Sequence, residues 1–335
     1  MYTYKERISV VISSYNAETT LPAALDALAQ QDISKENFEV IIVDDGSTDG
    51  SKQLIEAYIQ KNTFTLKYYY QSNKWVGIAR NYGIQYAQWD ILAFTDADCI
   101  CDKNWLSVIR KAIREENKQF IWWETYCNDT VLFPWKMAPV NHVWVTANLA
   151  LDRKVLPEWY MLFNLWFTGM LGDDIDLVLS LRDVWIHLVS VPEMKVQHPA
   201  NILTFERFLI RRKWRMNEVG LYKKHGKKTL DCFSSIYKPR IFWRISLFTL
   251  IILLALLWAT LIWQLYGMQW IIYAAIGIFV LFVGYGYKAL VIHQPVGQKI
   301  TIVERIKTFF YALLTIPLFF KARIQGMIKF NFFLL

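Results

Sequence analysis

The sequence feature that constrains the fold most is an uncharged stretch of 43 residues between Arg244 and Lys288. It contains two apolar runs, residues 245–263 and residues 268–287, which are separated by a short turn. A helix needs about 20 apolar residues to cross the hydrocarbon core of a bilayer. We therefore predict two transmembrane helices over these runs, arranged as a hairpin.

The distribution of Lys and Arg predicts the orientation of this hairpin. Basic residues flank both of its ends, and the positive-inside rule places such flanks in the cytoplasm. We therefore expect residues 1–235 to form a cytoplasmic domain at a cell membrane, with a bacterial membrane favoured. A further apolar run, residues 308–320, has 13 residues and is short for a span. Residues 300–335 are expected to form an interfacial or re-entrant amphipathic segment, and a third span is the alternative.

The formal net charge of +8 is unevenly distributed along the chain. Residues 1–205 carry a net charge of −7, whereas residues 206–244 carry a net charge of +9. Clustered bases can bind nucleic acid, but anionic lipid explains a basic juxtamembrane segment more simply. We expect membrane lipid as a partner and no nucleic acid. A solvated basic face and a site for a lipid-pyrophosphate acceptor are the alternatives for this segment.

Upstream of the basic segment, short apolar strands alternate with helices. Such alternation is typical of an α/β fold with a doubly wound, mostly parallel sheet, so we predict a Rossmann-like domain. Strands are predicted at residues 8–13, 38–43, 65–70 and 91–95, and helices at residues 19–31, 49–61 and 77–87.

Three of the predicted strands end in polar residues, Ser13–Asn16, Asp44–Ser47 and Asp96–Asp98. Ligands bind beyond the carboxyl ends of such strands, so we expect these residues to meet at one crevice. Asp96 and Asp98 can hold Mg²⁺ or Mn²⁺ shared with substrate phosphates, and a solvated turn is the alternative. The chain lacks GxGxxG after its first strand and lacks GxxxxGK[ST]. Dinucleotide-binding and P-loop functions therefore lose their main support.

A second group of carboxylates, Asp173, Asp174 and Asp176, opens a predicted helix that follows Gly172. The helix macrodipole stabilises acidic residues at a helix N-terminus, which is one sufficient explanation for them. Alternatively, one of them is a general base that removes a proton from a hydroxyl nucleophile. The residue pattern by itself leaves both interpretations open.

The cysteines give no sign of a metal site. The chain has four of them, and their positions show no zinc-ligand spacing. A cytoplasmic domain keeps its cysteines reduced, so ordinary free thiols are expected. The four residues are Cys99, Cys101, Cys127 and Cys232.

Five segments together carry a more specific pattern. They are SVVISSYNAETTLPAALDAL (9–28), VIIVDDGSTDGS (40–51), GIARNYGIQYAQWDILAFTDAD (77–98), TANLALDRKVL (146–156) and GDDIDLVLSLRDVWIHLVSVPEMKVQH (172–198). In this order they resemble the family 2 glycosyltransferases with the GT-A fold, and the resemblance covers roughly residues 7–225. It implies a nucleotide-sugar donor, with a UDP-sugar favoured. It also implies a divalent metal, Mn²⁺ or Mg²⁺, and inverting transfer to an acceptor hydroxyl.

The resemblance implies roles for the donor-binding residues. Ser13 matches the residue whose backbone meets the nucleobase, and Tyr15 belongs to the same donor-binding cluster. Asp45, the second Asp of its pair, matches the carboxylate that binds uracil. Arg80 matches a contact to the donor phosphates.

The resemblance also implies the metal ligands and the base. Asp96 and Asp98 match the DxD pair, with Asp98 as the direct metal ligand, and His198 stands where a His near the diphosphate is common. Asp174 matches the catalytic base, whereas Asp173 stands where Glu is more common. The shorter side chain leaves the base assignment open between these two residues.

These expectations combine into one functional hypothesis. We expect a membrane-anchored, metal-dependent, inverting glycosyltransferase that builds a cell-surface glycan on the cytoplasmic face. The Gln-x-x-Arg-Trp motif of processive polymer synthases is absent, since residues 211–215 read RRKWR. A polyprenyl-phosphate glycosyltransferase is the alternative enzyme. A catalytically inactive nucleotide-sugar-binding scaffold is the alternative outside catalysis.

Overall fold

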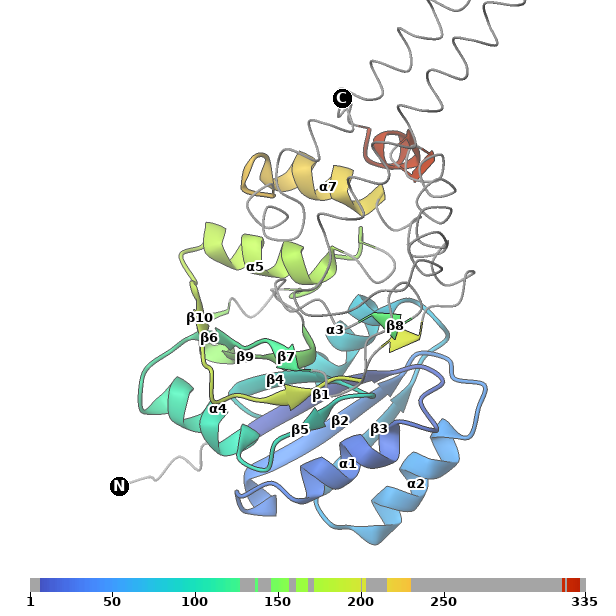
Figure 1. Ribbon diagram of the computed structural model, residues 1–335, viewed down its shortest axis with the longest axis vertical. Helices are drawn as coiled ribbons and strands as arrows, with labels where there is room; N and C mark the ends of the chain where they lie inside the picture. The colour runs from blue at the N-terminus through green and yellow to red at the C-terminus, as the bar shows by residue number, and fades with distance from the viewer. Residues whose placement is uncertain are drawn as a thin grey trace, which may run out of the picture.

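A computed structural model of the chain shows an α/β domain with helices on both faces of a central sheet (Figure 1). The residues that this structure describes are 7–126, 136–137, 146–156, 161–167, 172–199, 201–202, 216–229, 321–322 and 324–331.

The central sheet has seven strands in the order β10-β6-β9-β4-β1-β2-β3. Every neighbouring pair is parallel except the two pairs made by β9, which runs antiparallel to both β4 and β6. The predicted mostly parallel sheet is therefore confirmed. The strands are β1 (Ile8–Ser14), β2 (Phe38–Asp44), β3 (Thr65–Tyr70), β4 (Ile91–Asp96), β6 (Phe120–Trp122), β9 (Leu149–Asp152) and β10 (Leu188–Ser190).

Six helices of the described residues are labelled. The four that sequence patterns predicted are found at nearly the predicted bounds, whereas α4 and α7 were not predicted. The helices are α1 (Leu21–Ala29), α2 (Ser51–Lys61), α3 (Val76–Tyr86), α4 (Trp105–Arg114), α5 (Asp173–Asp183) and α7 (Met216–His225). Short 3₁₀ turns occupy Lys35–Asn37, Thr146–Asn148 and Arg153–Val155.

The sheet is buried on both faces because successive side chains of a strand point to opposite sides. In β1, Val10 and Ile12 pack into the cluster that contains α1 and α4 residues, whereas Val11 packs into the cluster formed with α3 and α5. All three side chains are at most 1% exposed. A continuous apolar run is therefore typical of a central strand that is buried on both faces, and not of a strand with one face in solvent.

Two smaller sheets extend the domain beside the central one. In the first, β11 (Val196–Gln197) lies between β5 (Ile100–Cys101) and β7 (Thr125–Tyr126). In the second, β8 (Lys136–Met137) pairs with β12 (Asn201–Ile202). The first of these sheets matters for function because it brings the chain that follows β11 back to the end of β4.

The end of the chain packs onto the domain. Residues 324–330 are helical and lie beside α7 (Figure 1), where Phe330 joins an apolar cluster with Ile175, Leu179 and Val219. The same residues present Ile328 on the opposite side, 76% exposed. The described end of the predicted segment 300–335 is thus a helix that packs Phe330 against α5 and α7 and leaves Ile328 exposed on its other side.

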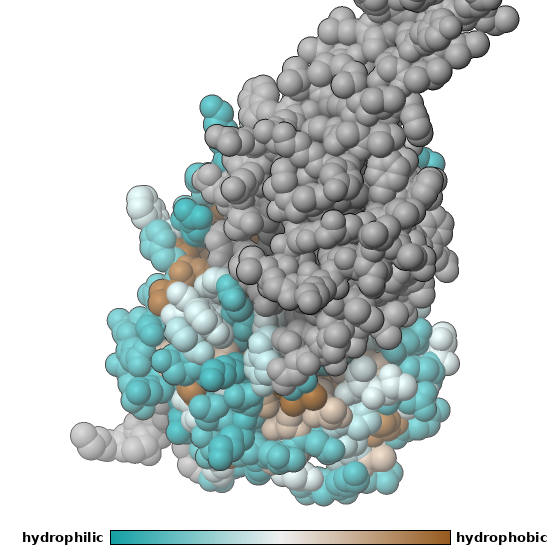
Figure 2. Space-filling model, viewed as in Figure 1, coloured by the Kyte–Doolittle hydropathy of each residue, from teal (hydrophilic) through white to brown (hydrophobic). Residues whose placement is uncertain are grey.

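The predicted membrane hairpin lies outside the described residues. This applies to both predicted spans, 245–263 and 268–287, to most of the basic segment 206–244 and to the apolar run 308–320. Within the described ranges, every helix is too short or too polar to span a bilayer. The visible described surface is mostly hydrophilic, with small scattered hydrophobic areas (Figure 2).

Candidate active site

The carboxyl ends of three adjacent parallel strands position the predicted donor-binding residues. The strand register pairs Ser13 of β1 with Asp96 of β4, and Ser14 with Asp44 of β2. The backbone N–H of Asp45 then donates to the Ser14 carbonyl at 2.8 Å. The predicted convergence of the strand-end residues is therefore what the structure shows. At this edge Ser13 is half-buried, and Tyr15 is 53% exposed.

The two acids that end β2 have different surroundings. Asp44 accepts hydrogen bonds from the Ser47 backbone N–H at 2.8 Å and from the Tyr68 hydroxyl at 3.0 Å, so it fixes the turn after the strand. Oδ1 of Asp45 accepts from Gln71 Nε2 and from the Lys74 backbone N–H, both at 2.7 Å. Because β3 ends just before Gln71, these bonds hold Asp45 at the carboxyl edge of the sheet.

Arg80 of α3 is a buried cation surrounded by carboxylates. Its Nη2 lies 2.9 Å from Asp96 Oδ1, and its Nη1 lies 3.1 Å from Asp173 Oδ2 and 3.5 Å from Asp174 Oδ1. These three charges raise the pKa of Arg80, so the guanidinium stays protonated although it is only 5% exposed. Arg80 thereby joins the end of β4 to the start of α5. Its predicted contact to donor phosphates stays a prediction.

The two carboxylates at the start of α5 differ in access to solvent. The side chain of Asp173 is 4% exposed, whereas that of Asp174 is 23% exposed. Gly172, which precedes them, has a φ of +112°, a left-handed value that glycine adopts readily and other residues avoid. The chain can therefore turn sharply into α5 and aim its first carboxylates at Arg80.

Asp174 has the ionisation that a general base requires. Burial, followed by the neighbouring charge of Asp173, raises the pKa of Asp174 to about 7. Arg80 and a hydrogen bond from Thr146 Oγ1, 2.9 Å from Asp174 Oδ1, act in the opposite direction. A carboxylate that titrates near neutral pH can both accept and release a proton there. The pKa of Asp173 is raised as well, mainly by burial.

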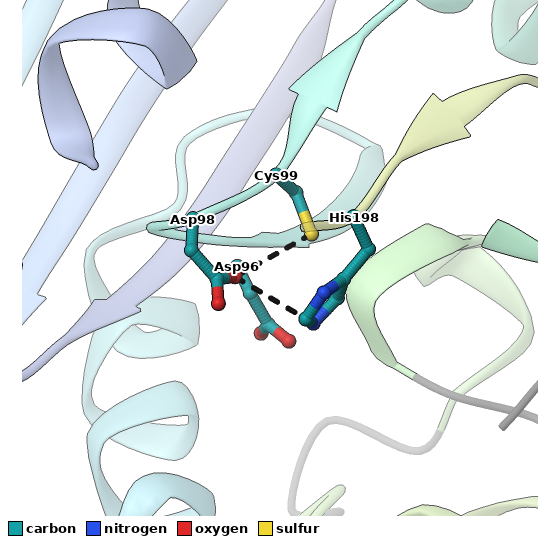
Figure 3. A group of neighbouring side chains, drawn as sticks. All are labelled: Asp96, Asp98, Cys99 and His198. Atoms are coloured by element: carbon teal, nitrogen blue, oxygen red, sulfur yellow. Dashed lines mark hydrogen bonds and ion pairs between the residues drawn. The ribbon is translucent and has the colours of Figure 1, made fainter. Parts of the chain in front are cut away.

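Four side chains converge into a candidate metal site at the end of β4 (Figure 3). These are Asp96, Asp98, Cys99 and His198, and one ligand atom from each lies within 4.8 Å of the others. His198 follows β11, and its backbone N–H donates to the Tyr126 carbonyl at 2.9 Å. The structure thus brings together the predicted metal ligands, which are separated by 100 residues of sequence between Asp98 and His198.

The hydrogen bonds of His198 leave one ring nitrogen available to a metal. Its Nδ1 lies 2.8 Å from the Pro199 carbonyl, which can only accept, so Nδ1 carries the proton. Nε2 then has a free lone pair and lies 3.7 Å from Asp98 Oδ1. Burial raises the pKa of Asp98, an effect that a bound cation would oppose. The two carboxylates suit Mn²⁺ or Mg²⁺, so the residues fit the implied metal.

Several residues of this site were not identified from sequence. Thr146 bonds Asp174, Gln71 bonds Asp45, and Cys99 lies in the metal cluster. Thr146 opens one of the five motif segments, and Cys99 directly follows the DxD pair. These positions were the sequence features that indicated, weakly, that both residues lie near the site. The expected free thiols are confirmed for Cys99 and Cys101, which are both buried.

Sequence comparisons show that the first half of this chain is similar to a known family. Residues 9–165 match the family model described as glycosyl transferase family 2. The chain is 30% identical over 115 residues to the poly(ribitol-phosphate) beta-N-acetylglucosaminyltransferase TarS of Staphylococcus aureus, which is 34% of this chain and 20% of TarS. It is 36% identical over 91 residues to the putative glycosyltransferase EpsH of Bacillus subtilis, covering 27% of this chain and 26% of EpsH. The chain therefore spans only about a quarter or less of these relatives.

Comparisons of structure find solved proteins with a similar fold. The mannosyltransferase PcManGT from Pyrobaculum calidifontis, solved with GDP-Man and Mn²⁺, superposes with a TM-score of 0.56 at 15% identity and covers 98% of this chain and 88% of that one. S. aureus TarS 1–349 in complex with UDP superposes with a TM-score of 0.51 at 17% identity and covers 95% and 90%. The fold is therefore GT-A-like, as the sequence resemblance implied.

Proposed function

We propose that this chain, whose residues 9–165 match the model of glycosyl transferase family 2, moves a sugar from a nucleotide-sugar donor to an acceptor hydroxyl. The observation that carries the proposal is the position of Asp96. It borders the candidate metal site and accepts from Arg80, which also holds Asp173 and lies beside Asp174. A metal for the donor diphosphate and a base for the acceptor would therefore act side by side.

In this mechanism Asp174 is the general base. It accepts the proton of the acceptor hydroxyl, whose oxygen then attacks the anomeric carbon of the donor sugar. The bond from that carbon to the diphosphate breaks, and its electron pair leaves with the diphosphate oxygen. One direct displacement inverts the anomeric centre, as in single-displacement glycoside hydrolysis. Asp174 suits this role better than Asp173, since Asp173 is more deeply buried and is held by Arg80 at 3.1 Å.

Asp98, Asp96 and His198 would hold the divalent metal. When bound, Mn²⁺ or Mg²⁺ supplies a Lewis acid that neutralises charge on the leaving diphosphate. The Nδ1–H bond of His198 keeps Nε2 directed at this site, and Arg80 keeps Asp96 in place beside it. The pre-formed arrangement reduces the reorganisation needed as charge develops.

The donor nucleotide would lie on the exposed edge between β1 and β2. We assign its recognition to the Ser13 backbone, Tyr15 and Asp45, and we favour a UDP-sugar. The support for uridine is the placement of Asp45 by Gln71 and Lys74. A relative of the same fold was solved with UDP, and another was solved with GDP-Man and Mn²⁺, so both nucleotides belong in the test.

We further propose that the enzyme acts at the cytoplasmic face of a membrane on a glycan or a lipid-linked saccharide. The support is the uncharged stretch between Arg244 and Lys288 and the bases on both of its sides. Reporter fusions at residue 266 and residue 335 test the topology. We expect the first on the far side of the membrane and the second on the catalytic side; both on the catalytic side would exclude the hairpin.

A donor panel tests the proposed activity. The full-length protein is incubated with UDP- and GDP-sugars, with Mn²⁺ or Mg²⁺, and with membrane lipid extract or soluble saccharides. Nucleotide release and sugar transfer are both measured. Transfer into an organic-soluble single-sugar product would identify the polyprenyl-phosphate alternative. Tight donor binding without transfer to any acceptor would identify a binding scaffold.

A matched pair of variants makes this experiment specific. Asp98→Asn should abolish metal-dependent transfer because the metal loses a charged ligand. Asp90→Asn alters an acid just before the opposite end of β4, where it pairs with Lys154 at 2.8 Å, and should retain transfer. Full activity in Asp98→Asn would exclude the proposed metal site.

A further inference from the structure

Cys99 belongs to the buried core cluster, and its sulfur also lies among the ligand atoms of the candidate metal site. The thiol donates to Asp98 Oδ1 at 3.7 Å, the same oxygen that His198 Nε2 approaches at 3.7 Å from another element. Figure 3 shows the thiol, the imidazole and both carboxylates directed toward one another. Cys99 is 1% exposed, so its sulfur is enclosed by the core on one side and by the potential ligands on the other.

The neighbouring Cys101 shows what an ordinary buried thiol looks like in this segment. It is 4% exposed, and its sulfur contacts Thr95 Oγ1 at 3.7 Å, away from the carboxylates. Among the groups of potential ligands in the described residues, Cys99 is included and Cys101 is not. Two buried thiols two positions apart therefore differ in the groups that surround the sulfur.

We propose that Cys99 is a fourth metal ligand, which makes this site bind thiophilic divalent ions such as Zn²⁺, Co²⁺ and Cd²⁺ in addition to Mn²⁺ and Mg²⁺. The proposal rests on the proposed function only in taking the cluster as a metal site. On binding such an ion, the sulfur forms a metal–sulfur bond and its proton leaves to solvent. No oxidant or reductant takes part, because the ion keeps its charge state.

The geometry allows all four groups to reach one ion. In a tetrahedral site zinc–sulfur bonds are about 2.3 Å and zinc–oxygen or zinc–nitrogen bonds are about 2.0–2.2 Å, so any two ligand atoms lie roughly 3.3–3.7 Å apart. The four atoms already lie within 4.8 Å of one another. Movements of roughly half an ångström per side chain therefore suffice.

Ligand softness determines which ions would use the sulfur. Hard Mg²⁺ prefers oxygen and keeps several waters, so it is held by the carboxylates and leaves the thiol unbound. Zn²⁺, Co²⁺ and Cd²⁺ accept thiolate, and nitrogen or sulfur sites bind Zn²⁺ and Co²⁺ more tightly than Mn²⁺. Cys99 would thus be a specificity-determining residue that sets which metals compete for the donor site.

Cobalt spectroscopy on the full-length protein tests this directly. Co²⁺ is titrated with and without UDP, in a background where Cys127 and Cys232 are replaced by serine. We expect a thiolate-to-cobalt charge-transfer absorption in the near ultraviolet. Cys99→Ser and Cys99→Ala should abolish this absorption and weaken Zn²⁺ and Cd²⁺ binding at least about tenfold, the lower end of the loss for outer-shell partners. Cys101→Ser, the matched control, should keep both the absorption and the affinity.

Mn²⁺ binding to the same proteins is measured by electron paramagnetic resonance. It distinguishes a site that lacks Cys99 as a ligand from a protein that has no metal site. If Cys99→Ser keeps its Mn²⁺ affinity while losing the cobalt absorption, the proposal is supported and the variant is folded. If the parent protein binds Mn²⁺ but shows no thiolate absorption with Co²⁺, Cys99 is not a ligand and the metal site itself stands. If the parent binds no divalent ion with or without UDP, both proposals are overturned.

Discussion

The guanidinium of Arg80 lies 3.1 Å from the carboxylate of Asp173, although 93 residues of sequence separate them. Because Arg80 also reaches Asp96 at 2.9 Å, one buried side chain joins the metal end of the site to its base end. A lone buried charge is costly, so the carboxylates and the guanidinium stabilise one another only as a group.

Arg80→Gln should both destabilise the protein and abolish transfer. Removing one member of a buried ion pair leaves its partners uncompensated and costs about 3–5 kcal/mol. Arg80→Lys keeps the charge but loses the planar fork that reaches Asp96 and Asp173 together, so it should be intermediate. Chemical denaturation measures the free energy of unfolding. Lys52→Gln, which removes an exposed pair with Glu56, is the control and should change stability by less than about 1 kcal/mol.

The rate of transfer should rise with pH through the pKa of Asp174. This pKa is raised to about 7, so Asp174 is protonated below that pH and becomes a base above it. Thr146→Val removes a hydrogen bond that lowers the pKa, and the rising limb of kcat/KM should therefore move to higher pH. A pH–rate profile of both proteins measures the shift. An unchanged limb in Thr146→Val would show that another group controls the profile.

The raised pKa of Asp174 also has a consequence for stability. A carboxyl whose pKa is higher in the folded state stabilises the fold when it is protonated, and this contribution is lost as pH rises through about 7. Asp174→Asn cannot ionise. Its stability should therefore fall less than that of the parent between pH 5 and pH 8, as measured by thermal unfolding in matched buffers.

Asp174→Asn and Asp173→Asn should distinguish loss of the catalytic base from loss of a structural partner of Arg80. Asp174→Asn keeps the shape of the side chain but removes the base, so donor binding should remain and transfer should be lost. Asp173→Asn removes a partner of Arg80 and should reduce stability and kcat together. Calorimetric donor binding, transfer rates and thermal unfolding distinguish the two. Transfer that survives in Asp174→Asn and disappears in Asp173→Asn would reverse the base assignment.

Much of the sheet could be predicted because its central strands are buried on both faces. Each reads as a mostly apolar run closed by polar residues, as in β4, where Thr95 and Asp96 follow residues 91–94. Strand β9 could not be predicted in this way. It has four residues, Leu149–Asp152, and its antiparallel direction is set by its contacts with β4 and β6 rather than by its own pattern.

The candidate site could be predicted only in part, because some of its contacts join segments that are far apart in the sequence. Asp96 and Asp98 follow a strand directly, so their place at the sheet edge is a local property of the sequence. The contact of Thr146 with Asp174 depends on how two distant segments pack. The resemblance suggested Arg80 as a phosphate contact, whereas its position among three carboxylates became visible only in the fold.

Phe330→Ala should destabilise the domain although residue 330 is far from every motif. Phe330 is 6% exposed and packs with Val219 and Ile175, and truncating a buried Phe costs about 3–5 kcal/mol. Ile328→Ala changes a residue of the same helix that is 76% exposed and should cost less than about 0.5 kcal/mol. Denaturant unfolding of both variants measures the difference. Equal effects would show that the helix does not dock as described.

The docking of residues 324–330 on α7 affects the order in which the domain can fold during synthesis. Lys223 of α7 donates to the Phe330 carbonyl at 2.6 Å, and 107 residues separate the two. At translation rates of about 5–20 residues per second, α7 leaves the ribosome roughly 5–20 s before its partner. Throughout that interval the apolar surface of α5 and α7 is uncovered. The nascent domain is therefore most open to chaperones and to aggregation after all of its motif residues have already been made.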